Sequence, residues 1–131
     1  MLVADTSSLI AFFEGDDGPD VEILDKALEE KFLLLVPPVI AEILSEPELP
    51  RPVREQILAL PVLPILEGYW ERTGALRAAL IAKGRKAKMA DSLIAQACLD
   101  HQAELIERDE DYQAFAKYGG LKLACARLRH R

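Results

Sequence analysis

Four carboxylate side chains lie in or next to apolar segments that we expect to be buried. An isolated charge is rare in such places. Asp5 directly follows the short apolar run 2–4, and Asp109 comes just after the predicted strand 104–106. Glu42 and Asp91 lie in apolar segments with helical spacing, and neither has a basic residue three or four positions later. Because an unpaired buried carboxylate costs several kcal/mol, such groups are normally paired or bound to a metal. A shared cation would satisfy all four acids together.

These four acids would form a site of oxygen ligands alone, without histidine or cysteine. Hard oxygen ligands favour Mg²⁺ or Mn²⁺ over Zn²⁺. We expect Asp5, Asp91 and Asp109 to bind the cation directly or through water. Glu42 is expected to be a further ligand, or to orient a water held by the cation. We therefore count all four as candidate catalytic residues.

Each acid taken alone also has a simpler interpretation. Asp91 is placed to cap a helix or to stabilise its dipole. Glu42 is compatible with a surface position, and Asp109 with a turn. The prediction of a metal site therefore depends on the four acids together, two at strand ends and two on apolar helices.

The elements that must position these acids alternate between strands and helices. This alternation predicts an α/β fold with a mostly parallel sheet and helices on both faces. In such sheets, sites form beyond the carboxyl ends of the strands, so Asp5 and Asp109 converge if their strands are neighbours. Strands are predicted over 2–4, 32–36, 62–65, 104–106 and 121–123, and helices from Thr6 to the loop 15–19, from Asp20 onward, and over 39–44, 50–60, 67–83 and 88–101.

Length and charge limit the class of protein. The chain has 131 residues and a formal net charge of −6, from 22 acidic and 16 basic side chains. This length predicts a single domain over 1–131, and the acidic balance argues against broad, non-specific nucleic-acid binding without excluding nucleic acid as a substrate. No apolar run approaches the roughly 20 residues of a membrane-spanning helix. With no secretory signal expected, Cys98 and Cys125 are predicted to be reduced, buried thiols of a cytoplasmic protein.

The segments around the four acids resemble the four acidic motifs of PIN-domain ribonucleases, and most closely those of VapC-type toxins from toxin–antitoxin pairs. The resemblance extends from Leu2 to Leu123, and the matching segments are LVADTSSLI, PPVIAEIL, MADSLIAQA and ERDEDY. It implies a PIN-like three-layer α/β/α sandwich. It also implies a Mg²⁺- or Mn²⁺-dependent endoribonuclease that forms a homodimer or higher homo-oligomer and is inhibited by a cognate antitoxin.

The sequence departs from the family pattern near the fourth acid. Glu107 stands where many members carry threonine, and its carboxylate either binds metal or points away. Tyr112 stands where phenylalanine is common. Asp111 is interpreted as a helix cap in preference to a ligand.

A nuclease must also bring a polyanion to an acidic protein, and basic residues close to the acids are candidates for this role. Lys83, Arg85, Lys86 and Lys88 lie just ahead of Asp91, where they would contact RNA phosphates or form a solvated charge run. A basic tail over about 124–131 would bind RNA or an antitoxin, or have no role; its charged residues are Arg127, Arg129, His130 and Arg131.

Other functions remain open at this point. The same fold would suit an RNA-processing nuclease that is not a toxin, or a catalytically silent RNA-binding or regulatory protein. A phosphatase that uses an aspartyl phosphate wants a second Asp two residues after the first, and here that residue is Ser7. A receiver-type signalling module would carry a phospho-acceptor Asp after a central strand, where this chain has Pro37 and Pro38. The chain also lacks a glycine-rich phosphate loop.

Overall fold

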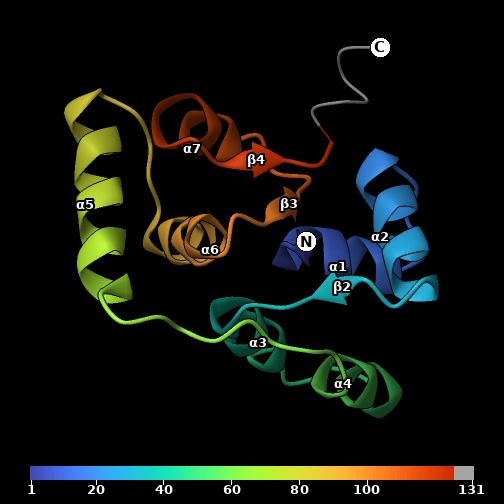
Figure 1. Cartoon of the computed structure of the whole chain (residues 1–131). Coiled ribbons are helices and arrows are strands. Elements are labelled where there is room, and N and C mark those ends of the chain that lie inside the picture. Colours follow the sequence, from blue (N-terminus) through green and yellow to red (C-terminus); the bar gives the residue numbers. More distant parts are fainter. Residues whose placement is uncertain (126–131) are drawn as a thin grey trace.

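Strands and helices alternate along residues 1–125, the part of the chain that the computed structural model describes (Figure 1). The predicted basic tail falls largely outside the described residues, including all four of its charged side chains. The strands are β1 (Leu2–Ala4), β2 (Leu33–Leu34), β3 (Glu104–Ile106) and β4 (Lys122–Leu123). The helices are α1 (Thr6–Phe13), α2 (Pro19–Glu29), α3 (Pro37–Leu44), α4 (Arg51–Leu58), α5 (Tyr69–Ala82), α6 (Met89–Asp100) and α7 (Tyr112–Gly119).

The four strands form one parallel sheet in the order β2-β1-β3-β4. β1 pairs with β3 in a register that places Val3 opposite Leu105 and Ala4 opposite Ile106. Parallel neighbours cannot be joined by a hairpin, so each connection crosses back over the sheet through helices. The chain runs from β1 to β2 on one side and later returns to β3 on the other side. β1 is therefore central, and the direction of winding reverses next to it.

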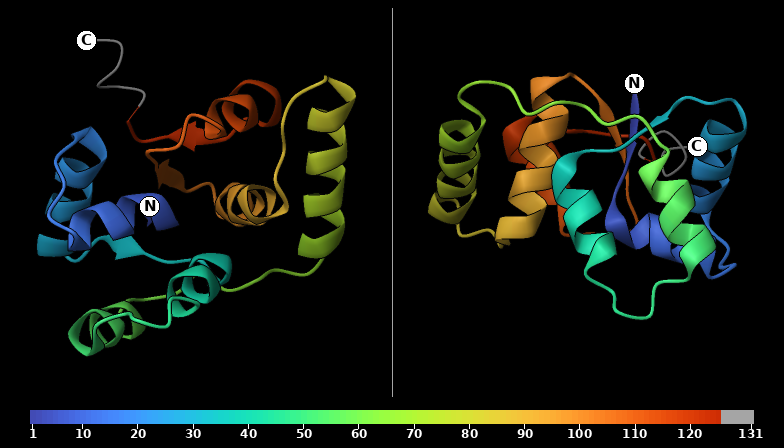
Figure 2. Two further views of the ribbon diagram at one scale, coloured as in Figure 1. Left: turned by 180° about the vertical axis from the view of Figure 1, so that it is seen from behind. Right: turned by 90° about the horizontal axis from the view of Figure 1, so that it is seen from below.

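Helices cover both faces of the sheet, which confirms the predicted three-layer α/β/α arrangement. α1 and α2 lie against one face, and α6 lies against the other with α5 packed outside it (Figures 1 and 2). α3 and α4 lie beside the β2 edge of the sheet (Figure 1). Among residues 1–125, no helix is long and apolar enough to cross a membrane.

The core fills both faces of the two central strands. Val3, Ala4, Leu105 and Ile106 are fully buried. Each fully buried aliphatic side chain of the size of leucine contributes roughly 1.5–3 kcal/mol. Burial on both faces explains why Val3 and Ala4 of β1, and Leu105 and Ile106 of β3, are consecutive apolar residues in place of an alternating pattern. Cys98 and Cys125 are buried thiols, as predicted.

Two of the predicted strands differ from the structure. The predicted strand over 62–65 is wrong: Val62 makes only an isolated parallel bridge to Leu35. Pro61 and Pro64 flank that bridge, and a proline has no N–H with which to extend a ladder. The predicted strand over 32–36 shortens to β2. The N–H of Phe32 donates to the carbonyl of Ala27 at the end of α2, so Phe32 lies outside the strand, and it is 63% exposed.

A further helix, α7, follows Asp111, for which the sequence suggested a helix cap without giving the helix a range. α7 begins three residues after Asp109 and ends at Gly119. The next residue, Gly120, caps the helix with a φ of +79°, a left-handed conformation that glycine adopts without strain. Its buried residues are Tyr112, Ala114 and Phe115. α7 matters for the site because it brings Asp111 and Tyr112 to the end of β3.

Candidate metal centre

Asp5 and Asp109 lie beyond the carboxyl ends of neighbouring strands. β1 and β3 pair directly, and the backbone N–H of Asp5 donates to the carbonyl of Ile106 over 2.9 Å. The condition on which their convergence depended, adjacency of the two strands, is therefore met. This edge of the sheet is also where the winding reverses, which is the usual place for a site in an open α/β sheet.

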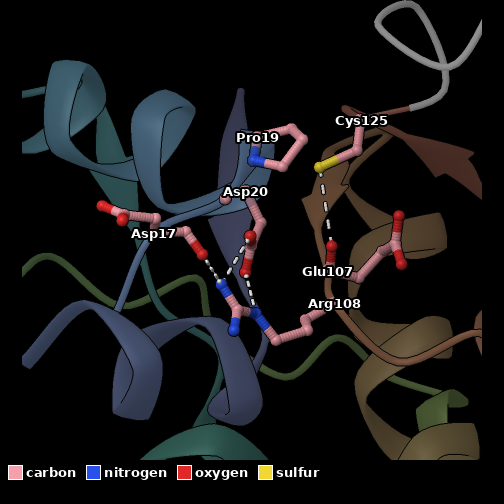
Figure 3. A pocket seen from close by; sticks show the side chains of 7 residues that line it. Asp17, Pro19, Asp20, Glu107, Arg108 and Cys125 are labelled. Atoms are coloured by element: carbon pink, nitrogen blue, oxygen red, sulfur yellow. Dashed lines mark hydrogen bonds and ion pairs between the residues drawn. The ribbon is translucent and has the colours of Figure 1, made fainter. Parts of the chain in front are cut away.

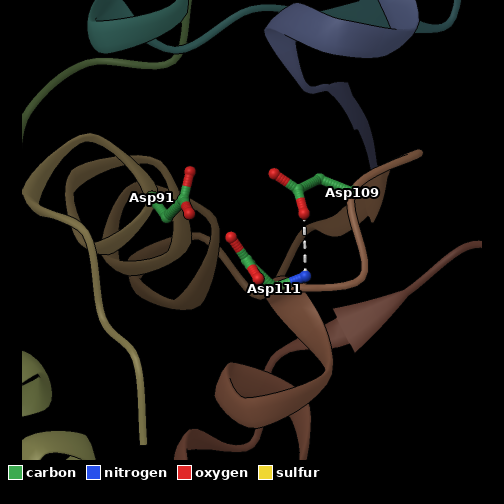
Figure 4. A group of neighbouring side chains, drawn as sticks. All are labelled: Asp91, Asp109 and Asp111. Carbon is green, nitrogen blue, oxygen red and sulfur yellow. Dashed lines mark hydrogen bonds between the residues drawn. The ribbon is translucent and has the colours of Figure 1, made fainter.

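The structure gathers three carboxylates into one group: Asp91, Asp109 and Asp111. One oxygen from each lies within 4.8 Å of the others (Figure 4). Asp91 stands in the first turn of α6, Asp109 in the loop after β3, and Asp111 just ahead of α7. The backbone N–H of Asp111 donates to Asp109 Oδ1 over 2.9 Å, which holds the loop in a tight turn. We refer to these residues as the three-acid group.

Asp111 corrects one prediction. It occupies the N-cap position of α7, but its side chain makes no capping hydrogen bond. Its carboxylate is directed instead toward Asp91 and Asp109 (Figure 4). A signal was present in the sequence, because two acids separated by one residue in a turn can point the same way.

Asp5 lies beside the three-acid group but outside it. Its side chain is 4% exposed, and two hydroxyl groups hold it: Ser7 Oγ donates to Oδ2 over 2.6 Å and the Tyr112 hydroxyl donates to Oδ1 over 2.8 Å. Burial raises the pKa of Asp5 above its usual value, and the hydrogen bonds from Ser7 and Tyr112 oppose this rise. Asp5 is therefore a buried carboxylate with a fixed orientation.

Asp91 is the most perturbed acid of the group. Burial, followed by the negative charges of Asp109 and Asp5, raises the pKa of Asp91 to about 6. Its Oδ2 atom is buried and accepts no hydrogen bond from any residue between 1 and 125. A divalent cation would satisfy this oxygen and remove the repulsion between the acids. The three-acid group therefore fits a hard divalent cation in both ligand chemistry and unmet charge.

Glu42 reaches the same region from α3. Thr6 Oγ1 donates to its Oε1 over 2.6 Å, and Thr6 is the residue that follows Asp5. Burial raises the pKa of Tyr112 far above its usual value, and the charges of Asp5, Asp91 and Glu42 add to this rise. Glu42 is solvent-exposed, unlike Asp5. The structure thus places it at the open rim of the site.

The four predicted basic residues divide into two pairs. Lys86 Nζ and Lys88 Nζ each lie 3.6 Å from Asp111 Oδ2, and both side chains are more than half exposed. Arg85 lies over the ring of Tyr118, 5.8 Å from its centroid. Lys83 is exposed just beyond the end of α5. Of these four basic residues, Lys86 and Lys88 are therefore the two that lie against the three-acid group.

Glu107 lies apart from the three-acid group, although it is only two residues from Asp109. It is 1% exposed and lines a separate cavity of about 330 Å³ (Figure 3). In the same cavity, the Arg108 guanidinium donates to both carboxylate oxygens of Asp20 and to the carbonyl of Asp17. The Arg108 side chain therefore lies at this cavity, whereas that of Asp109 lies in the three-acid group. Glu107 lines the cavity, and its carbonyl accepts a hydrogen bond from Cys125 while its carboxylate points away from the Arg108–Asp20 pair (Figure 3).

We compared the sequence and the structure of this chain with those of known proteins. The PIN domain family model matches residues 2–119. The structure is similar to VapBC2 from Rickettsia felis bound to a DNA fragment from their promoter, with a TM-score of 0.71 and 20% identity over 93% of this chain and 96% of that chain. It is also similar to FitAcB from Neisseria gonorrhoeae, with a TM-score of 0.68 and 16% identity over 94% of this chain and 96% of that chain. No curated protein sequence matches significantly. Since the family model spans nearly all of the described residues, this chain belongs to the PIN domain family.

Proposed function

We propose that this protein is a metal-dependent endoribonuclease that acts as the toxin of a toxin–antitoxin pair. Two observations carry the proposal: one oxygen from each of Asp91, Asp109 and Asp111 lies within 4.8 Å of the others, and no described residue donates a hydrogen bond to the buried Oδ2 of Asp91. Membership of the PIN domain family supports nuclease activity. Toxin function is supported by the shared fold with VapBC2.

In this mechanism, the carboxylates hold the cation and the surrounding residues hold the carboxylates. Asp91, Asp109 and Asp111 would bind Mg²⁺ or Mn²⁺, with Asp5 as a neighbouring direct or water-bridged ligand. When bound by these carboxylates, a divalent cation would lower the pKa of a bound water to near neutral and would offset charge on the phosphate. Ser7 and Tyr112 keep Asp5 oriented through their hydrogen bonds. Glu42, at the exposed rim, is placed to accept a proton from an attacking water.

Lys86 and Lys88 provide the positive charge that an RNA strand needs near this acidic site. Both stand beside Asp111 and are more than half exposed, so they can contact phosphates without leaving their place. Lysine contacts of this kind are insensitive to sequence, because they are made to the backbone. We therefore expect Lys86 and Lys88 to determine how tightly RNA binds, and not which sequence is cleaved.

A groove next to the site is a candidate surface for the antitoxin. It has a volume of about 600 Å³ and lies between α1, α3 and α4. Both apolar side chains and glutamates line it. One of these glutamates, Glu42, also lies at the rim of the metal centre. A partner segment with apolar and basic side chains would therefore cover the groove and reach the site. The apolar lining residues are Ile10, Phe13, Ile43, Leu49, Pro50 and Val53, and the glutamates are Glu14, Glu42, Glu46 and Glu48.

Cleavage of a labelled structured RNA tests the activity. Wild type, Asp5→Asn and Asp25→Asn would be purified identically and assayed with Mg²⁺, with Mn²⁺ and with EDTA. Asp25 is an exposed acid on α2, so its variant controls for loss of one charge and for contaminating nucleases. We expect metal-dependent cleavage by wild type and Asp25→Asn, and none by Asp5→Asn. Equal cleavage by all three proteins would contradict the proposal.

Growth after induced expression tests the toxin role separately. We expect wild type to arrest growth, Asp5→Asn to leave it unaffected, and a small protein encoded just upstream to restore it when co-expressed. Cleavage in vitro without growth arrest would favour an RNA-processing nuclease. RNA binding without cleavage would favour the catalytically silent alternative.

A further inference from the structure

Tyr112 brings a single buried hydroxyl group into the metal centre. It is the first residue of α7 and is fully buried. Its ring packs against Phe115 in the core, with 6.0 Å between ring centroids. Ring packing alone needs no hydroxyl, yet the hydroxyl is directed at Asp5 Oδ1 over 2.8 Å. The ring anchors the side chain, and the hydroxyl acts on the site.

The hydroxyl completes a cradle around Asp5. Ser7 Oγ holds one oxygen of the carboxylate and the Tyr112 hydroxyl holds the other, so both oxygens have a donor. Ser7 is local, two residues along the chain, whereas Tyr112 is 107 positions away and arrives with α7. Hydrogen bonds to an ionised carboxylate are about twice as strong as neutral ones. The orientation of Asp5 therefore depends on the docking of α7.

Tyr112 also lies near a second acid of the centre. Burial raises the pKa of its phenol, and the charges of both Asp5 and Asp91 add to this rise. A phenol has one proton to donate, and the Tyr112 hydroxyl donates it to Asp5.

We propose that Tyr112 is a positioning residue whose hydroxyl holds the Asp5 carboxylate beside the three-acid group and thereby sets the affinity for the divalent cation. This inference rests on the proposed metal-dependent function. Some residues do not touch a metal but hydrogen-bond to one of its ligands. Mutation of such a residue typically lowers metal affinity or activity 10–100-fold. Tyr112 would act through Asp5, without contact with RNA.

The test compares Tyr112→Phe with Tyr69→Phe. Both tyrosines are fully buried, and the Tyr69 hydroxyl donates to a backbone carbonyl, that of Leu93, in place of a carboxylate. Each variant thus loses one buried hydroxyl and one hydrogen bond. Calorimetric titration with Mn²⁺ is expected to show binding about 10-fold weaker for Tyr112→Phe, and unchanged for Tyr69→Phe.

The outcomes separate this inference from the proposed function. Equal Mn²⁺ binding by wild type and Tyr112→Phe overturns the inference alone. No binding by the wild type overturns the inference and the proposed function together. Cleavage assays add a second readout: the Mg²⁺ concentration for half-maximal cleavage should rise by about the same factor, 10-fold, while KM for RNA stays unchanged. A merely structural role would lower Tm in both variants and leave the Mg²⁺ requirement unchanged.

A spectroscopic measurement keeps the inference testable if Tyr112→Phe does not fold. The chain has three tyrosines. In a Tyr69→Phe/Tyr118→Phe protein labelled with 3-fluorotyrosine, the one remaining ¹⁹F resonance reports on Tyr112. We expect this resonance to shift with added Mg²⁺ and to saturate at the affinity that calorimetry gives for the same protein. A resonance that does not move through saturation would overturn the inference.

Discussion

The Arg108 guanidinium forms an ion pair with the buried carboxylate of Asp20, with Nε 2.9 Å from Oδ2, across 88 positions of the chain (Figure 3). Ser8 Oγ donates to the same carboxylate over 2.9 Å. Arg108 directly precedes Asp109, so this pair ties the loop of the metal centre to the start of α2. Two contacts therefore hold this loop: the Arg108–Asp20 ion pair outside the site and the hydrogen bond from the Asp111 N–H to Asp109 within it.

Replacement of Asp20 is expected to destabilise the fold. Asp20→Asn keeps the shape of the side chain but leaves Arg108 without its counter-charge. A hydrogen bond to a charged group contributes about 1.5–3 kcal/mol, and partial exposure of Arg108 reduces this to about 1–2 kcal/mol. Urea unfolding at pH 7 measures the difference, with Asp25→Asn as the control for an exposed acid on the same helix. A loss no greater than that of Asp25→Asn would contradict the prediction.

The Asp20 variant should also change how stability depends on pH. Arg108 and Ser8 hold the pKa of Asp20 below its usual value of 3.8, although burial acts in the opposite direction. A lowered folded-state pKa contributes stability above the unfolded value, and this is lost as pH falls through the folded value. We expect wild type to lose stability below about pH 4 more steeply than Asp20→Asn. Parallel curves of unfolding free energy against pH would show that the pair has no such effect.

Replacement of Asp91 is expected to abolish Mn²⁺ binding while stabilising the metal-free protein. The folded-state pKa of Asp91 is raised from 3.8 to about 6, so its ionisation costs stability as pH rises through that range. Asp91→Asn removes this cost, which we place at about 1 kcal/mol at pH 7 because the side chain is only half-buried. Thermal unfolding in EDTA at pH 7 and at pH 4 measures it. A variant less stable than wild type at pH 7 would contradict the prediction.

Protons and metal should compete for the same centre. With the pKa of Asp91 at about 6, cation binding must displace a proton when the pH lies at or below that value. We expect Mn²⁺ affinity to fall as pH drops from 7.5 to 5.5, by a factor of about three to five. Calorimetry in two buffers of different ionisation enthalpy, at both pH values, measures the protons released. Release that is equal at the two pH values would rule out this competition.

Lys86 and Lys88 should act on RNA and leave the metal in place. A Lys86→Ala/Lys88→Ala protein is expected to show a higher KM for RNA and a shallower dependence of log K on log salt, by about one to two phosphate contacts. Its Mn²⁺ affinity should not fall, since Asp111 loses two positive neighbours and becomes more attractive to a cation. Lys26→Ala/Lys122→Ala, which removes two exposed lysines elsewhere, is the matched control. If both double variants changed KM and the salt dependence equally, the loss of net positive charge alone would explain the result, and the prediction would be wrong.

Local sequence determined the alternation of elements and the position of the acids along them. The continuous apolar run over 32–36 predicted a buried strand of a parallel sheet, which the structure keeps as the shorter β2, and helix spacing around Asp91 predicted α6. These features depend on neighbouring residues, so periodicity and turn residues report them directly. The same reasoning failed over 62–65, because an apolar pattern does not reveal whether a backbone flanked by prolines can complete a ladder.

Only the tertiary structure decided which strands are neighbours and which acids meet. Strand order in a parallel sheet depends on where each crossover returns, and nothing in the sequence beside Asp5 or Asp109 specifies that β1 lies next to β3. The same holds for contacts across long separations. Asp111 joins Asp91, Tyr112 holds Asp5 and Arg108 pairs with Asp20 only after α7 and α2 have packed on the sheet. The sequence by itself determined the chemical groups of the centre, and packing of the helices decided their geometry.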